Sequence, residues 1–358
     1  MVLPDSVDLS HIPIPTNDGE QLLFRNLFET LVGIDCQGQV RPQLAAAWTR
    51  DSAGRTWTFT LRDSRSAGDK SDMAELIASS WHDRWDAVTA LGVASVSIQG
   101  DGRLRVSMRT SLDSLPRIFA DPTLAQSHQT DSAPWPMTEA GIRRSHLGPG
   151  LVSFRVKRNI DSRDALDAGA DVMVTRDPEL LDYAARRPEF SVFPLPWNRT
   201  YVLLWPSDAD SAPRRLSDAV RAEARPAEPP FWWEDLAGCA ERAVPSPRSR
   251  SARVVYSRGD DVARALAERT VAIANADVNL RTAALEPSEF AASLTNGLDQ
   301  AYVMALPGQT LSPCRDASRW PSGATVQPLI DTRAHAIVRR GVPPLAVDWD
   351  GTVRMVPR

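Results

Sequence analysis

The stretch that most constrains the fold is residues 25–62, with the sequence RNLFETLVGIDCQGQVRPQLAAAWTRDSAGRTWTFTLR. Apolar side chains at helical spacing predict an amphipathic helix over residues 20–32, followed by a glycine-containing turn between short strands. Pro42 is expected to open a second short helix, QLAAAW, because proline suits the first helical turn. The strict alternation of TWTFTLR predicts a half-buried strand over residues 56–62. One cysteine and no histidine occur here, so a catalytic site is not expected in this stretch.

Two further patterns extend the N-terminal half of the chain. MAELIASSWHDRW, residues 73–85, predicts a helix with Asp72 as its N-cap and Glu75 completing a capping box. ASVSIQGDGRLRVSMR, residues 94–109, predicts a hairpin around a Gly-Asp-Gly turn. Residues 120–150 contain SAPWPM and HLGPG, which break regular structure, and are expected to be rich in loops.

The second half alternates between strand and helix patterns. Residues 151–205 predict strand, helix, strand, helix and strand, with Asp177 and Pro178 starting the second helix. Residues 206–252 are dense in Pro, Arg, Ser and Ala and predict an extended surface crossing between lobes. Residues 252–306 repeat the strand and helix alternation, and the tail after them is rich in strand patterns. This alternation favours an α/β fold.

Charge and hydropathy narrow the function classes. The chain has 358 residues and a net charge of −4, so no global field favours nucleic acid or an anionic membrane. No apolar run is long enough to span a bilayer. The N-terminal residues show no signal-peptide pattern. Two interpretations stay open: a cytoplasmic protein that starts at Met1, or an exported protein whose signal was removed.

Catalytic and metal-binding motifs were sought without a positive result. The sequence shows no GxSxG, Walker, HExxH or GxGxxG motif, and its five histidines are scattered. We therefore expect a protein that is not an enzyme, with no cofactor and no metal site. The three cysteines, Cys36, Cys239 and Cys314, have no metal-ligand spacing. One disulfide with a leftover thiol, with Cys239 and Cys314 as the pair considered, and three free thiols are both open.

The opening stretch resembles a known signature. NLFETLVGIDCQGQVRPQLAAAWTRDSAGRTWTFTLRD is similar to the N-terminal pattern of the peptide/nickel/oligopeptide family of extracellular solute-binding proteins, which serve ABC importers. The family pattern is roughly N-[LI]-[FY]-E-x-L, a D-x-x-G turn, P-x-L-A-x-x-W and a W-x-F-x-L-R strand. The residues in register are Asn26, Phe28, Glu29, Leu31, Asp35, Gly38, Pro42, Leu44, Ala45, Trp48, Trp57, Phe59, Leu61 and Arg62.

Weaker similarities follow along nearly the whole chain. They occur in the segments MAELIASSW, LGPG, ALDAGADVMV, RRLSDAVRAEA, FAASLTNGLDQAYVM and QPLIDTRAHAIVRRGV. The chain is shorter than typical members, with apparent deletions after LGPG and within residues 206–252.

The resemblance implies an α/β fold of the two-lobed periplasmic-binding-protein type (type II, cluster C-like), with strands that cross at a hinge. The expected division places residues 1–30, 148–222 and 326–358 in the core of lobe I, residues 31–147 in its small subdomain, and residues 223–325 in lobe II. It also implies capture of a small molecule between the lobes, handover to an ABC importer permease, a monomer, no nucleic-acid partner, and a periplasmic or extracellular location.

The resemblance indicates the class of ligand less directly than it indicates the fold. In peptide-binding relatives, the strand equivalent to DQAYVM leads to an aromatic residue and then to an Asp that binds the peptide's α-amine. Here Ala305 and Gly308 stand near those two positions. We expect a peptide-like, opine or metal-chelate ligand. The alternative is a degenerate binding-protein fold that acts as a sensory or protein-interaction module.

The expected ligand-binding residues come from four loops. The stretch PWNRTYVLLW supplies the strongest candidates, since aromatic walls with an arginine suit a flat or anionic ligand. For Trp197 and Tyr201 a core role, and for Arg199 a solvated role, stays an equal alternative. Trp135 is a candidate cover for the cleft, but packing on its own lobe is the favoured interpretation. The full candidate set is Asn17, Asp18, Trp135, Trp197, Asn198, Arg199, Tyr201, Gln309 and Thr310.

Overall fold

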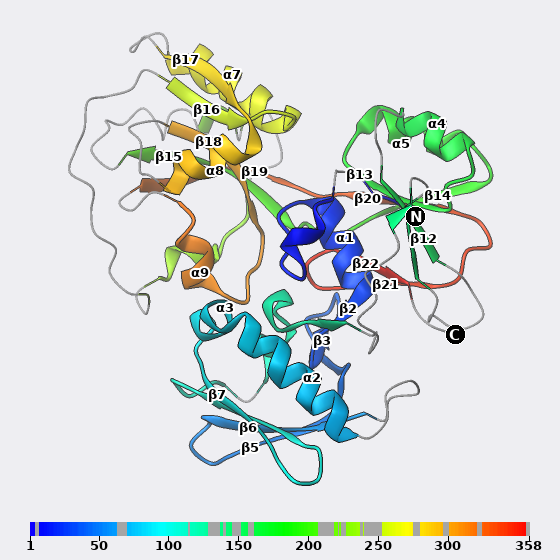
Figure 1. The fold of residues 1–358 in the computed structure, drawn as a ribbon. Coiled ribbons are helices and arrows are strands. Elements are labelled where there is room, and N and C mark those ends of the chain that lie inside the picture. The colour runs from blue at the N-terminus through cyan, green and yellow to red at the C-terminus, as the bar shows by residue number, and fades with distance from the viewer. Residues whose placement is uncertain are drawn as a thin grey trace. The chain divides into compact units, whose positions relative to one another are not determined.

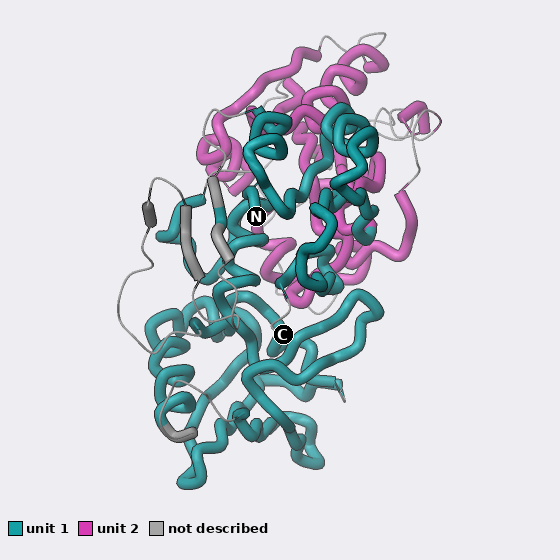
Figure 2. Tube along the Cα trace, turned by 90° about the vertical axis from the view of Figure 1, so that its right-hand side faces the viewer, with its two compact units in different colours: residues 1–196, 334–358 teal, residues 197–333 magenta. Residues whose placement is uncertain are grey.

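The structure is a computed structural model that forms two compact units (Figure 2). Unit 1 comprises residues 1–196 and 334–358, and unit 2 comprises residues 197–333. The residues described are 1–3, 7–62, 70–113, 115–127, 137–138, 141–144, 152–156, 161–206, 218–220, 222, 227–236, 239, 253–274, 280–295, 301–320 and 324–355.

The main sheet of unit 1 has the strand order β10-β11-β12-β1-β13-β20-β14. Its strands are β1 (Val2–Leu3), β10 (Met137–Thr138), β11 (Gly141–Arg144), β12 (Val152–Val156), β13 (Val172–Thr175), β14 (Phe190–Pro194) and β20 (His335–Arg339). Strand β1 runs parallel to β12 and β13, whereas β20 runs antiparallel to β13 and β14.

Alternate residues of this sheet enter two separate hydrophobic cores. Val2 and Ile337 pack with helices α4 (Ser162–Asp167) and α5 (Pro178–Ala185) on one face. Their neighbours Leu3 and Ala336 pack with helix α1 (Asp18–Leu27) on the other. The period of two along a strand explains why neighbours in sequence separate in this way. The sequence prediction for α5 is confirmed: Asp177 caps the helix and Pro178 occupies its first turn.

A second, four-stranded sheet in unit 1 is antiparallel with the order β5-β6-β8-β7. Its strands are β5 (Ala45–Arg50), β6 (Thr56–Leu61), β7 (Val93–Ile98) and β8 (Leu104–Met108). Strand β6 buries Trp57, Phe59 and Leu61, as its alternation predicted. Helix α2 (Lys70–Asp83) lies against this sheet and leads to α3 (Trp85–Ala90) (Figure 1). The predicted hairpin is confirmed, with Gly102 at φ +75° in its turn.

Three local predictions for unit 1 were wrong. The helix predicted over residues 20–32 ends at Leu27, because Phe28–Glu29 (β2) pairs with Gln126–Ser127 (β9). QLAAAW forms no helix, because its last four residues begin β5 and pair with β6. Pro42 instead ends β4 (Val40–Pro42), which pairs with β3 (Val32–Ile34) in a two-stranded sheet. Proline is tolerated there because a strand at a sheet edge can lack one donor.

The remaining correction concerns a helix start. Helix α2 begins at Lys70, so Asp72 lies in its first turn rather than at the N-cap. The short 3-10 helices of unit 1 are η1 (Leu9–His11), η2 (Arg117–Ala120) and η3 (Pro122–Leu124). The C-terminal hairpin consists of β21 (Leu345–Val347) and β22 (Val353–Met355).

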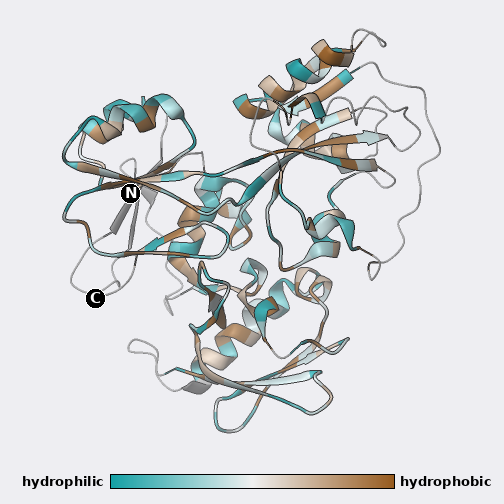
Figure 3. Ribbon diagram, turned by 180° about the vertical axis from the view of Figure 1, so that it is seen from behind, coloured by the Kyte–Doolittle hydropathy of each residue, from teal (hydrophilic) through white to brown (hydrophobic). Residues whose placement is uncertain are grey.

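Unit 2 contains a five-stranded sheet with the order β17-β16-β18-β15-β19. The strands are β15 (Arg199–Pro206), β16 (Arg253–Ser257), β17 (Arg281–Leu285), β18 (Ala301–Pro307) and β19 (Ala324–Thr332). Its helices are α7 (Asp261–Ala274), α8 (Pro287–Thr295), α9 (Pro313–Ala317) and the 3-10 helix η4 (Trp232–Glu234). Leu203 packs with α7 and Leu204 with α8, so the two faces of the sheet are covered by different helices. The helices carry both hydrophilic and hydrophobic residues, as packing by one face requires (Figure 3).

The chain passes between the units twice. It leaves β14 for β15 through residues 195–198 and returns from β19 to β20 through residues 333–334. Unit 2 begins at residue 197 rather than at the expected 223, because β15 pairs with both β18 and β19. The division of unit 1 into a core and a small subdomain over residues 31–147 stays a prediction. No helix of the described residues is long and apolar enough to cross a membrane.

Candidate functional site

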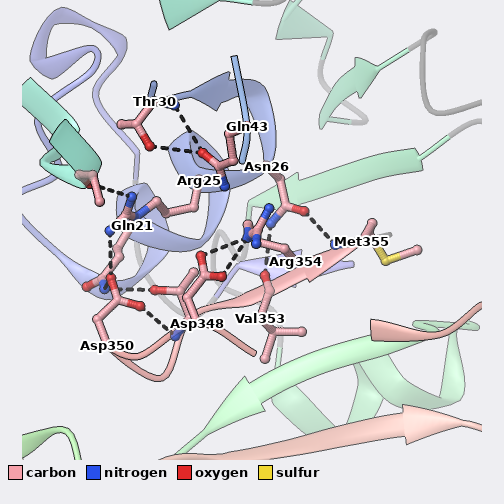
Figure 4. A network of polar contacts seen from close by, with 12 residues as sticks. Gln21, Arg25, Asn26, Thr30, Gln43, Asp348, Asp350, Val353, Arg354 and Met355 are labelled. Atoms are coloured by element: carbon pink, nitrogen blue, oxygen red, sulfur yellow. Dashed lines mark hydrogen bonds and ion pairs between the residues drawn. The ribbon is translucent and has the colours of Figure 1, made fainter. Parts of the chain in front are cut away.

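Two polar side chains of helix α1, beside the signature residues, connect it to other parts of unit 1. Arg25 donates from Nη2 to Asp350 Oδ2 at 3.0 Å and from Nη1 to Ala120 O at 3.2 Å (Figure 4). Gln21 donates to the same carboxylate oxygen at 3.1 Å and to Thr352 Oγ1 at 2.8 Å. Helix α1 is thereby fixed to the loop between β21 and β22.

Asn26 makes the second connection between α1 and this hairpin. Its Nδ2 donates to Leu22 O at 2.7 Å and to Val353 O at 3.0 Å, and its Oδ1 accepts from Met355 N at 2.9 Å (Figure 4). Asn26 is 2% exposed, so water cannot replace these bonds. Asn26 therefore occupies its signature position for a structural reason.

The pKa values of two carboxyl groups in this network are shifted in opposite directions. Burial alone would raise the pKa of Asp350, but the Arg25 charge and the Thr352 hydrogen bonds outweigh it and lower that pKa. Burial raises the pKa of Asp348, although Arg354 Nε contacts both of its oxygens at 2.8 and 2.7 Å. The network connects α1 to the C-terminal hairpin within unit 1.

Glu20 organises the N-terminal loop, which we define as residues 8–20. Its buried carboxylate accepts from Asp8 N at 3.0 Å, Thr16 N at 2.8 Å and Thr16 Oγ1 at 2.8 Å. His11 Nδ1 lies 2.9 Å from Glu20 Oε1. The hydrogen bond to Glu20 raises the pKa of His11. Burial would raise the pKa of Glu20, but its hydrogen bonds, first those from Asp8 N and Thr16 N, lower it.

This loop presents the two candidates Asn17 and Asp18. Asn17 is the N-cap of α1 and accepts from Glu20 N at 2.9 Å. Asp18 Oδ2 lies 3.6 Å from Arg176 Nη2, and both side chains are less than one-third exposed. Arg176 directly follows the carboxyl end of β13, and ligands of open α/β sheets bind at such ends. Arg176 was missed from the sequence, because its nearness to Asp18 depends on the fold.

Unit 2 brings a second group of candidates together at the crossings. Trp197 is 39% exposed, and the guanidinium carbon of Arg333 lies 4.5 Å from the centroid of its ring. Asn198 O accepts from Gly308 N at 2.7 Å, which places the loop after β18 beside Trp197. Gln309 follows and is exposed. We call Trp197, Asn198, Gly308, Gln309 and Arg333 the crossing cluster.

Gly308 has close backbone neighbours in this cluster. A Cβ atom at this position would lie 3.3 Å from both Asn198 C and Trp197 O. Such contacts are tighter than ordinary van der Waals distances, and both partners are backbone atoms. A side chain at Gly308 would therefore require the neighbouring backbone to shift by a few tenths of an ångström.

The remaining candidates are either bonded within the fold, half-buried, or outside the described residues. Tyr201 is 2% exposed and donates to Asp260 Oδ1 at 2.9 Å, so the core alternative holds for it, whereas Trp197 is exposed. The Thr310 hydroxyl contacts Asp316 Oδ2 and accepts from Ser312 N at 3.1 Å, which gives it a role within its own loop. Arg199 is half-buried at the start of β15. Trp135 lies outside the described residues.

A disulfide and an aromatic cluster fix the loop after β18. Cys239 and Cys314 are bonded, with a Cα–Cα distance of 5.3 Å, and Cys36 is an exposed free thiol. Trp232 donates from Nε1 to Pro307 O at 2.9 Å, and its ring lies 5.5 Å from that of Trp320. Gln309 therefore belongs to a loop whose neighbouring residues are fixed by a disulfide and a hydrogen bond.

One pocket lies apart from these residues, on helices α4 and α5. It has a volume of about 410 Å³ and is lined by Arg163, Glu179, Asp182, Tyr183, Arg186 and Arg187. Its arginines are largely occupied: Arg163 pairs with Glu179 at 2.9 Å and Arg187 with Asp167 at 2.8 Å. The described residues contain no group of three or more His, Cys, Asp or Glu side chains that could hold a metal ion.

Comparison with solved structures shows the fold. A dipeptide-binding protein from Pseudoalteromonas sp. SM9913, solved with Met-Leu, matches with a TM-score of 0.70 and 12% identity over 99% of this chain and 98% of its own. NikA from Staphylococcus aureus, solved with Ni(L-His)2, matches with a TM-score of 0.64 and 11% identity over 99% and 97%. The peptide pheromone receptor PrgZ matches with a TM-score of 0.61 and 12% identity over 98% and 96%.

These likenesses confirm the expected α/β fold of the two-lobed periplasmic binding proteins. Sequence comparison adds one short match. The nickel-binding periplasmic protein of Escherichia coli K12 is 51% identical over 37 residues, which span 10% of this chain and 7% of that protein. No family model matches the chain.

Proposed function

We propose that this chain, which has the fold of the peptide and nickel substrate-binding proteins, captures a small ligand for an ABC importer. The observation that carries the proposal is the structural match along 99% of the chain to a dipeptide-binding protein that also matches along 98% of its own length. A match of this extent includes both units, so neither unit is an addition to an unrelated domain. The short identity to a nickel-binding periplasmic protein points the same way.

The proposed ligand-binding residues come from each unit separately. In unit 1 they are Asn17 and Asp18 at the start of α1, together with Arg176 beyond β13. In unit 2 they are the side chains of the crossing cluster, since Trp197 offers an exposed aromatic face and Gln309 an exposed amide. Tyr201 and Thr310 are left out because their hydroxyls bind Asp260 and Asp316.

The ligand class includes peptide-like, opine and metal-chelate molecules. The matched structures were solved with Met-Leu and with Ni(L-His)2, so the fold holds both kinds of ligand in other proteins. The close backbone contacts at Gly308 favour an amine-binding arrangement unlike that of the peptide-binding relatives. We include a monomer and an importer permease as partner in the proposal.

Export from the cytoplasm completes the proposal. The Cys239–Cys314 disulfide supports it, because such bonds persist in oxidising compartments and are rare in reducing ones. Native mass spectrometry of the full chain, produced with an export signal, tests the function. A single adduct of small-molecule mass on each chain is expected. A protein that stays at its own mass after incubation with dipeptides, opines and nickel–histidine contradicts it.

A second candidate function is a degenerate binding fold that serves as a sensory or protein-interaction module. The observation in its favour is again Gly308. The Asp that binds the peptide amine in peptide-binding relatives would here crowd the backbone of Trp197 and Asn198. Under this alternative no small molecule binds, although the chain is fully folded.

A further inference from the structure

Arg333 has the indole ring of Trp197 as an aromatic partner. Its guanidinium lies 4.5 Å from the centre of the Trp197 ring, and among the residues that the structure describes no carboxylate is paired with it. The nearest acidic residue in sequence, Asp331, is occupied: its carboxylate accepts from Thr200 Oγ1 at 2.7 Å and from Glu228 N at 2.8 Å. Arg333 therefore lies over an aromatic ring and has no carboxylate counter-ion within the described part of the chain.

Stacking on an indole leaves an arginine able to bind an anion. An indole ring attracts the cation without accepting from all five N–H donors, which lie in the plane of the guanidinium. Those donors match the two oxygens of a carboxylate in a bidentate geometry. Because Trp197 limits the conformations of the side chain, less entropy is lost when a ligand binds.

The surroundings of this pair are suited to ligand contact. Trp197 is 39% exposed although it is a large apolar side chain, so one of its surfaces reaches solvent. Both residues lie where the chain passes between units. Trp197 lies between the end of β14 and the start of β15, and Arg333 lies between the end of β19 and the start of β20. The anchored loop that carries Gln309 lies beside them through the Gly308–Asn198 hydrogen bond.

We infer that Arg333, held on Trp197, is a specificity-determining residue that binds a carboxylate group of the ligand. The ligand of this protein is accordingly a small molecule with at least one free carboxylate. This inference rests on the proposed function and narrows it, because it excludes neutral ligands such as sugars and esterified or amidated peptides.

A titration that needs no knowledge of the natural ligand tests the inference. The probe is glutarate, a flexible dicarboxylate, and the control is glutaramide, its uncharged diamide, both at constant ionic strength. The readout is tryptophan fluorescence of the full chain, with W197F defining the part of the signal that comes from Trp197. Glutarate is expected to change the Trp197 signal in a saturable way at millimolar concentration, and glutaramide is expected not to.

Variants then assign the effect to Arg333. R333Q is expected to weaken glutarate binding at least tenfold, and R333K to give an intermediate loss, because an ammonium group lacks the bidentate plane. R281Q is the matched control, since Arg281 is an exposed arginine on β17 of the same sheet. Glutarate binding that is absent in the wild-type chain, or equal in R333Q and R281Q, overturns the inference.

The outcome is separable from that of the proposed function. A glutarate response lost in R333Q, together with no adduct in mass spectrometry, supports the carboxylate site and contradicts a transport role. An adduct whose ligand has no carboxylate, or whose affinity is unchanged in R333Q, supports the transport role and overturns the inference.

Discussion

The guanidinium carbon of Arg333 lies over the Trp197 ring, 4.5 Å from its centroid, at the two places where the chain passes between its units. The contact lies wholly within unit 2. It joins the residue that begins this unit to the residue that ends it. A ligand group bound by Arg333 would therefore lie at the crossing segments.

The disulfide is expected to contribute strongly to the stability of unit 2. Cys239 and Cys314 are 75 residues apart, and closing a loop of that length stabilises by about 4 kcal/mol in the chain-entropy account. The double variant C239S/C314S should lose about that amount in urea unfolding. C36S, which removes the exposed free thiol, should change the midpoint little. Equal midpoints for the double variant and the wild type would show that the bond does not stabilise the fold.

Removal of the Arg25 side chain should destabilise unit 1. Arg25 and Asp350 are 12% and 16% exposed, so R25M leaves a mostly buried carboxylate without its counter-ion. The expected loss is about 3 kcal/mol near neutral pH. The loss should shrink at acidic pH, because Asp350 can then take up a proton and become neutral. A pH-independent loss in urea unfolding would contradict this account, and R25K serves as the charge-preserving control.

The N-terminal loop should be most stable in a window of pH. Glu20 has a lowered pKa in the fold, so its contribution is present above the pKa of an ordinary glutamate and is lost as the pH falls through the lowered value. His11 has a raised pKa, so its contribution is present below the ordinary histidine value of about 6.5 and is lost as the pH rises through the raised value.

Hydrogen exchange of residues 8–20 measures this window. Protection should be greater at pH 5.5 than at pH 8.5, after correction for intrinsic exchange. H11Q should remove the difference, and H82Q, on helix α2, should leave it in place. Equal protection at both values in the wild-type chain would mean that the His11–Glu20 contact does not hold the loop.

A side chain at Gly308 should cost stability without restoring peptide binding. G308A places a Cβ against the backbone of Trp197 and Asn198, and crowding of this kind costs about 1–3 kcal/mol. G308D adds the family's acidic group and should be at least as destabilised. G100A is the control, since nothing lies within 4 Å of its added atom. A stable G308D variant that gains affinity for Met-Leu would contradict the structural explanation.

Local alternation was the most informative pattern in the sequence. The strand of Trp57, Phe59 and Leu61 was predicted from its period of two, which states directly which side chains are buried. The helix predicted over QLAAAW failed for a different reason. Alanines favour helices locally, but pairing with β6 adds a ladder of hydrogen bonds that local propensity does not include.

The candidate site could be predicted only in part, because its contacts join distant segments. Trp197 and Asn198 were proposed from their own stretch, but Arg333 and Arg176 offered no local pattern to mark them. Their partners, Trp197 and Asp18, come from other elements. Likewise the burial of Tyr201 depends on how α7 covers its sheet, and the sequence left its role open.

A thermal-shift screen of the full chain tests the central claim most directly. The panel contains dipeptides, opines, nickel–histidine and sugars, with C-terminal amides of the same dipeptides as controls. The account predicts that one carboxylate-bearing class raises the melting temperature in a saturable way, since ligand at a hundredfold over Kd adds about 2.7 kcal/mol. A flat response across the panel, from a chain that unfolds cooperatively, would contradict it.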